Sequence, residues 1–186
     1  MQQATTVLTL PGWLGSGQGH WQTRWEQLFG AQRVQQHNWD QPLRGDWVAA
    51  LEEHMLDAIQ QTQTATPRFA VAAHSLGCHL LAAWALHSQH AHWVVGALLV
   101  APPDLAQANT PPALARWQPP ATKALPFKAV VLGSDNDPFS SWASTQRLAK
   151  QWGAASQCMT NAGHINADTA LGDWPDGWRH LQQLLE

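Results

Sequence analysis

Positive charge and long apolar runs are both scarce in this sequence. Lys and Arg together number 10 among 186 residues and form no cluster, so the electrostatic footprint of a nucleic-acid-binding protein is missing. No uninterrupted apolar stretch is long enough to span a membrane. Residues 1–6 lack the basic start and apolar core of a signal peptide. We therefore expect a cytoplasmic protein with neither a nucleic acid nor a membrane as partner.

Cysteine is also scarce, with Cys78 and Cys158 as the two examples. Their separation fits no metal or redox motif, and we expect both to be buried thiols in a reducing compartment. His87, His90 and His92 lie close together near an expected helix end, but they lack the regular spacing of zinc ligands. We expect these histidines to be solvated and the protein to hold no metal ion.

Tyrosine is absent, whereas tryptophan occurs 12 times. Some of these indoles fall in apolar helix or strand surroundings, where core packing is the simplest expectation: Trp84, Trp93 and Trp152. Others fall in expected loops, where they are candidates for an apolar substrate pocket: Trp13, Trp142 and Trp174.

The chain length and a hydrophobic content of 45% fit one well-packed domain over residues 1–186. Apolar runs bounded by turn residues predict strands at Thr6–Leu10, Arg33–His37, Phe69–Ala73, Trp93–Val100, Lys128–Gly133 and Ala155–Met159. Helical spacing predicts helices at Trp21–Phe29, from a cap at Asp46 to near Thr62–Thr66, and at Cys78–Leu86, Trp142–Trp152 and Trp174–Leu185. Strands that alternate with helices predict an α/β fold with a mostly parallel sheet covered on both faces.

Residues Val71–Gly77 follow an apolar run and precede a helical stretch, which is the context that presents a nucleophilic serine. Ser75 would occupy the tip of a sharp turn, so the residues two before and two after it must be small. Ala73 and Gly77 meet that requirement, although the consensus has glycine at both positions. Alone, the pattern also arises by chance at helix starts, where serine is a good cap.

Partners for this serine follow two later strands, and ligands of open α/β sheets lie at the carboxyl ends of the strands. Asp137 follows the fifth strand and His164 follows the sixth, which gives the chain order nucleophile, acid, histidine of the α/β-hydrolases. His164 would accept the hydroxyl proton and Asp137 would orient the imidazole. Asp135 competes with Asp137, which we prefer because Pro138 stiffens the turn after it. Asp104, after the fourth strand, is a further substitute.

An acyl-transfer site also needs N–H donors for the developing oxyanion. The backbone N–H of Leu76 begins the helix after Ser75, and the second donor is expected in the loop after the first strand, at Trp13 or alternatively at Leu14. The glycines of that loop do not fit G-x-G-x-x-G, and no P-loop lysine follows them, so phosphate binding is not expected.

With these residues assembled, the chain resembles the small serine hydrolases related to retinoblastoma-binding protein nine, within the α/β-hydrolase superfamily. The motifs that carry the resemblance are Pro11-Gly12-Trp13 with Gly19-His20-Trp21-Gln22, His74-Ser75-Leu76-Gly77, Asp137-Pro138-Phe139, and Gly163-His164-Ile165-Asn166 leading to Leu171-Gly172-Asp173-Trp174-Pro175. The resemblance implies an α/β-hydrolase fold with strand order 2-1-3-4-5-6 and no large lid. It also implies a triad of Ser75, Asp137 and His164 that works without a cofactor.

From these features we expect a serine hydrolase that cleaves small to medium acyl esters through an acyl-enzyme. Candidate substrate contacts are Leu14, His74, Phe139 and Trp142. One alternative is an amidase or aminopeptidase with the same triad, for which the substrate would be a small amide. Another is a protein-interaction module with a vestigial site. The sequence leaves any protein partner open.

Overall fold

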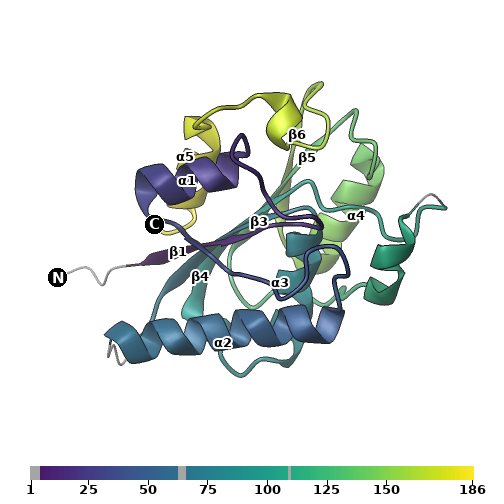
Figure 1. Cartoon of the computed structure of the whole chain (residues 1–186). Coiled ribbons are helices and arrows are strands. Elements are labelled where there is room, and N and C mark those ends of the chain that lie inside the picture. The colour runs from purple at the N-terminus through teal and green to yellow at the C-terminus, as the bar shows by residue number, and fades with distance from the viewer. Residues whose placement is uncertain (1–4, 63–65, 109) are drawn as a thin grey trace.

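Six parallel strands form one sheet in the order β2-β1-β3-β4-β5-β6 in the computed structural model, which describes residues 5–62, 66–108 and 110–186 (Figure 1). The strands are β1 Thr6–Leu10, β2 Gln32–Arg33, β3 Phe69–His74, β4 Val94–Val100, β5 Ala129–Ser134 and β6 Ala155–Met159. The predicted fold class and strand order are confirmed.

Helices cover both faces of this sheet (Figure 1). Their bounds are α1 Trp21–Phe29, α2 Arg44–Thr62, α3 Leu76–His87, α4 Trp142–Trp152 and α5 Pro175–Gln183. Short 3₁₀ turns lie at Ala91–Trp93, Pro112–Trp117 and Ala167–Thr169. One apolar cluster joins the sheet to α2, α3 and α4, and a second joins it to α1 and α5.

Strand β3 shows why the sheet is buried on both sides. Its side chains alternate, so that Phe69, Val71 and Ala73 belong to the first cluster, while Ala70 and Ala72 belong to the second. Every residue of β3 is buried. A continuous apolar run is the pattern that such a central parallel strand requires.

Three local predictions are wrong. Strand β2 pairs with β1 only through Gln32 and Arg33, because the chain leaves the edge of the sheet after Val34 donates to Thr9 O. Asp46 lies in the first turn of α2, where its charge faces the helix N-terminus, and not at the cap. Cys158 is exposed because β6 is an edge strand. The expected end of α2 partly lies outside the described residues.

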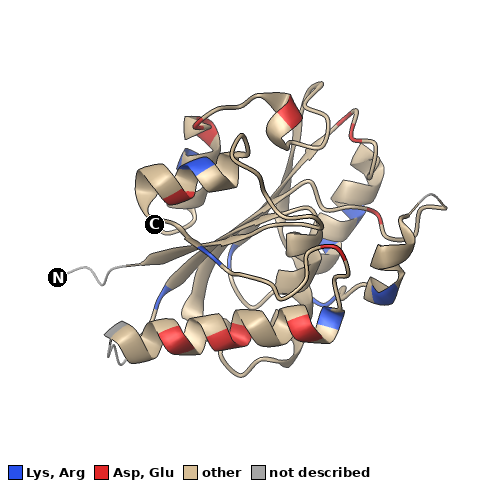
Figure 2. Cartoon of the chain, viewed as in Figure 1, with Lys and Arg blue, Asp and Glu red and all other residues tan. Residues whose placement is uncertain are grey.

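Charged side chains are spread thinly over the molecule. Figure 2 shows Lys and Arg scattered over several elements, whereas acidic side chains recur along α2. None of the described helices is both long and apolar enough to cross a membrane.

The closest backbone approach near the end of β3 occurs at Gly77, in the first turn of α3. A Cβ atom there would lie 2.2 Å from the carbonyl oxygen of Leu10 and 3.0 Å from that of Pro11. Real Cβ atoms do not approach backbone so closely, so only glycine lets α3 start this near to β1. The small residue expected at this position has a direct steric reason.

We expect Gly77→Ala to destabilise the protein by about 1–3 kcal/mol, because β1 and α3 must separate to admit a methyl group. Thermal unfolding measures this loss. Gly45→Ala is the matched control, since a Cβ on Gly45 meets nothing within 4 Å. A Gly77→Ala protein as stable as the control variant would contradict this packing argument.

A buried histidine couples this packing to pH. His79 on α3 is 2% exposed, and its Nε2 donates to Pro103 O at 2.8 Å. Burial is the main cause that lowers the pKa of His79 from 6.5 to about 4. The imidazole is therefore neutral in the folded chain at pH values where the unfolded chain begins to bind a proton.

The lowered pKa of His79 predicts that its contribution to the free energy of unfolding is complete above pH 6.5 and declines as the pH falls towards 4. The contribution of His79 has a slope of up to about 1.4 kcal/mol per pH unit. His79→Gln keeps a donor but cannot titrate in this range, so urea unfolding between pH 7 and pH 4.5 should show a shallower pH dependence. An unchanged slope would contradict the assignment.

Candidate active site

Ser75 joins β3 to α3 in a backbone conformation that residues other than glycine rarely adopt. Its φ is 53° and its ψ is −123°, a strained state that costs about 1–3 kcal/mol and needs support from its surroundings. The Ser75 N–H donates to Val100 O at 2.8 Å. A Cβ on Gly12 would lie 2.7 Å from Ser75 Cβ, so the loop after β1 also closes tightly on the turn.

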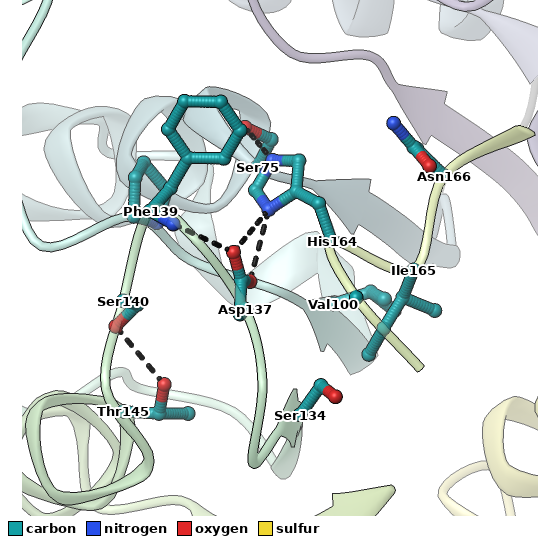
Figure 3. A network of polar contacts seen from close by, with 12 residues as sticks. Ser75, Val100, Ser134, Asp137, Phe139, Ser140, Thr145, His164, Ile165 and Asn166 are labelled. Carbon is teal, nitrogen blue, oxygen red and sulfur yellow. Dashed lines mark hydrogen bonds and ion pairs between the residues drawn. The ribbon is translucent and has the colours of Figure 1, made fainter. Parts of the chain in front are cut away.

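A continuous chain of hydrogen bonds runs from this serine (Figure 3). His164 Nε2 lies 2.9 Å from Ser75 Oγ. His164 Nδ1 lies 3.0 and 2.9 Å from the two carboxylate oxygens of Asp137. The Asp137 side chain is 2% exposed, and its Oδ1 also accepts from the backbone N–H of Phe139 at 2.9 Å. This arrangement holds the imidazole between a hydroxyl and a buried carboxylate.

The two competing acids point elsewhere. Asp135 Oδ1 accepts from the Asn161 N–H at 2.7 Å. Asp104 accepts from Ser144 Oγ at 2.7 Å and from the Ala106 N–H at 3.0 Å. Of the three candidates, the structure therefore brings only Asp137 to His164.

A buried histidine, His74, contacts His164, and a second, His20, packs against His74. His74 Nε2 donates to His164 O at 2.9 Å, and the His20 ring packs edge-on against His74 at 4.6 Å between centroids. Burial, followed by Arg33 and His164, lowers the pKa of His20 to about 3. Burial, followed by the charges of His20 and His164, holds the pKa of His74 well below its usual value. Both neighbours are thus neutral at ordinary pH.

The backbone amides considered as oxyanion donors differ in their partners. The Leu14 N–H donates to Trp39 O at 3.1 Å, which leaves it no proton for a ligand. Neither the Trp13 N–H nor the Leu76 N–H donates to any residue that the structure describes. Of the two alternatives in the loop after β1, Trp13 is the one with an available N–H.

A cleft of about 330 Å³ opens beside Ser75 and His164. Three of the candidate contact residues line it, namely Leu14, His74 and Phe139, together with Trp13. Pro103, Leu114, His20 and Asn166 also line it but were not predicted from the sequence. His20 and Asn166 belong to the motifs that carry the family resemblance, whereas nothing in the sequence indicated Leu114.

Two tryptophans expected near the cleft lie away from it. Trp142, the first residue of α4 after the Ser141 cap, is not among the cleft-lining residues. Trp174 is 5% exposed and packs with Trp21 and Trp25 in the core beside α1 and α5. Both tryptophan predictions are corrected accordingly.

Similarity to solved structures agrees with this architecture. A YdeN-like hydrolase described from Pectobacterium atrosepticum is 27% identical, with a TM-score of 0.79 over 98% of this chain and 91% of its own. The ydeN gene product of Bacillus subtilis is 22% identical, with a TM-score of 0.71 over 97% and 98%. A Bacillus cereus carboxylesterase is 14% identical, with a TM-score of 0.59 over 97% and 87%, and this likeness shows the fold alone.

A search of curated protein sequences found no match to this chain. The model of the serine hydrolase family, in contrast, matches residues 7–183. That match includes every strand of the sheet but the first residue of β1, as well as Ser75, Asp137 and His164. The chain therefore belongs to the serine hydrolase family.

Proposed function

We propose that this hydrolase cleaves small to medium acyl esters through an acyl-enzyme on Ser75. The observation that carries the proposal is the 2.9 Å contact between His164 Nε2 and Ser75 Oγ, with Asp137 on the opposite side of the imidazole. A hydroxyl is a poor nucleophile until a base accepts its proton in the transition state. His164 is that base, and Asp137 fixes its tautomer and stabilises the imidazolium.

In the first half of the reaction, Ser75 Oγ attacks the carbonyl carbon of the ester while its proton moves to His164 Nε2. The negative charge that develops on the carbonyl oxygen is bound by the Trp13 and Leu76 N–H groups. The tetrahedral intermediate then collapses, the ester C–O bond breaks, and the alcohol leaves with the proton from His164.

In the second half, water attacks the acyl-enzyme and gives a proton to His164. The bond between Ser75 Oγ and the acyl carbon breaks, Ser75 recovers its proton from His164, and the carboxylic acid leaves. All protons are carried by His164, so the cycle needs no cofactor.

The chemistry of the cleft favours an uncharged acyl group. Its lining is mainly apolar, with Trp13, Leu14, Pro103, Leu114 and Phe139, and among the described residues that line it there is no Lys, Arg, Asp or Glu. An aminopeptidase binds a free ammonium group, and burying that charge without a carboxylate partner is costly. We therefore place the ester ahead of the aminopeptidase. The narrower kinship to retinoblastoma-binding protein nine and the cytoplasmic location stay predictions.

The direct test of the nucleophile is labelling with a fluorophosphonate probe. We expect the wild-type protein to be labelled and Ser75→Ala to lose all labelling. Ser88→Ala is the matched control, because Ser88 lies in another part of the fold, where its Oγ donates to Glu52. A protein that is never labelled, or a label that survives in Ser75→Ala, would favour a vestigial site and overturn the proposal.

Substrate class is tested with p-nitrophenyl esters of matched size. We expect kcat/KM for a neutral butyrate ester to exceed that for a cationic aminoacyl ester by about 10²-fold or more, since an unpaired buried charge costs several kcal/mol. The corresponding aminoacyl p-nitroanilide should be cleaved more slowly still. Preference for either aminoacyl substrate would instead support the peptidase alternative.

A further inference from the structure

The loop that carries His164 is bound to the loop that carries Asp137 by three side chains in a row. Ser134 Oγ accepts from the Ala162 N–H at 2.9 Å, and Asp135 Oδ1 accepts from the Asn161 N–H at 2.7 Å. Asn136 Oδ1 accepts from the Gly163 N–H at 2.7 Å. We refer to these three bonds, formed by residues 134–136 with residues 161–163, as the loop clamp.

The clamp ends one residue before each of the two residues that face each other in the site. Asn136 directly precedes Asp137, and Gly163 directly precedes His164. The bond from Gly163 to Asn136 therefore fixes the separation of the two backbones immediately before the bond from His164 to Asp137. Figure 3 shows the Asp137 carboxylate directed at the His164 ring, with Ser134 on the side of Asp137 away from the histidine.

The backbone of the histidine loop explains why such a device is needed. Asn161 has a φ of 53°, Gly163 of 56° and Ile165 of 50°. Asparagine tolerates this left-handed conformation, whereas for the β-branched Ile165 it is unfavourable. Successive N–H groups in a loop of this kind point to one side and need acceptors, and the clamp supplies them.

Burial makes Ser134 the central member of the clamp. Ser134 is fully buried, and its hydroxyl donates to Asn136 Oδ1 at 2.7 Å while it accepts from the Ala162 N–H. Asn136 Oδ1 thus receives one bond from Ser134 and one from Gly163. The Ser134 and Asn136 side chains form one connected unit, and Asp135 contributes a separate acceptor oxygen beside them.

The geometry points to Ser134, Asp135 and Asn136 as positioning residues that hold His164 on Asp137, a role that rests on the proposed hydrolase function. What the clamp requires is an oxygen acceptor at each position, and the charge of Asp135 is dispensable. Asp135 and Asp137, two residues apart, therefore have separate roles: the first holds the histidine loop and the second orients the imidazole.

The experiment compares kcat and KM for a neutral p-nitrophenyl ester. Asn136→Ala should lower kcat by about 10²-fold, as expected when a reacting group is misplaced by about 1 Å, while KM changes less than threefold. Asp135→Ala should also lower kcat. Asp135→Asn keeps the Oδ1 acceptor and should therefore retain most of the wild-type kcat. Asp176→Ala is the control, because it removes an exposed carboxylate that pairs with Arg179 on α5.

A spectroscopic measurement separates positioning from general loss of structure. In folded wild-type protein, the proton on His164 Nδ1 that is shared with Asp137 should give a downfield NMR resonance. We expect that resonance to weaken in Asn136→Ala and to persist in Asp135→Asn and Asp176→Ala. If the wild-type protein is active and Asn136→Ala keeps both its kcat and this resonance, the clamp is wrong; if the wild-type protein has no esterase activity, the proposed function is wrong.

Discussion

The close approach of α3 to β1 at Gly77 is the constraint on which the rest of the site depends. A Cβ on Gly77 would lie 2.2 Å from Leu10 O. Because glycine lacks that atom, α3 can begin beside β1 and the chain can reverse at Ser75, which takes the strained conformation with φ of 53°. The strain is maintained by central strands that are buried on both faces. Consequently the hydroxyl stands at the carboxyl edge of the sheet, where the later loops can reach it.

The loops that carry Asp137 and His164 are held by polar bonds together with apolar packing. The Ser134–Asn136 side chains bind the backbone before His164, His74 binds the carbonyl oxygen of His164, and Phe139 packs edge-on against its ring at 4.6 Å. The imidazole is therefore held from several directions. The buried His74 and His20 are neutral, so they add no positive charge near this imidazole at ordinary pH.

The sequence predicted the fold well because strand and helix signals in this chain are local. The run Phe69–Ala73 and the small residue at Gly77 reflect contacts that any such turn requires. Predictions failed where tertiary contacts decide: nothing in the sequence near Trp142 or Trp174 distinguishes a cleft wall from a helix start or a core position. The clamp was missed because acceptor side chains in a loop become informative only when the opposing N–H groups are known.

The central claim is that Ser75 carries the acyl group during turnover, and an activated carbamate ester tests it most directly because carbamoyl-enzymes are hydrolysed slowly. After inactivation, the intact mass of the protein and the mass of each proteolytic peptide are measured beside residual esterase activity. The account predicts one carbamoyl group, located on the peptide that contains Ser75, with activity lost in proportion to its occupancy. Stoichiometric modification of another residue, or full activity in a protein whose Ser75 is carbamoylated, would contradict it.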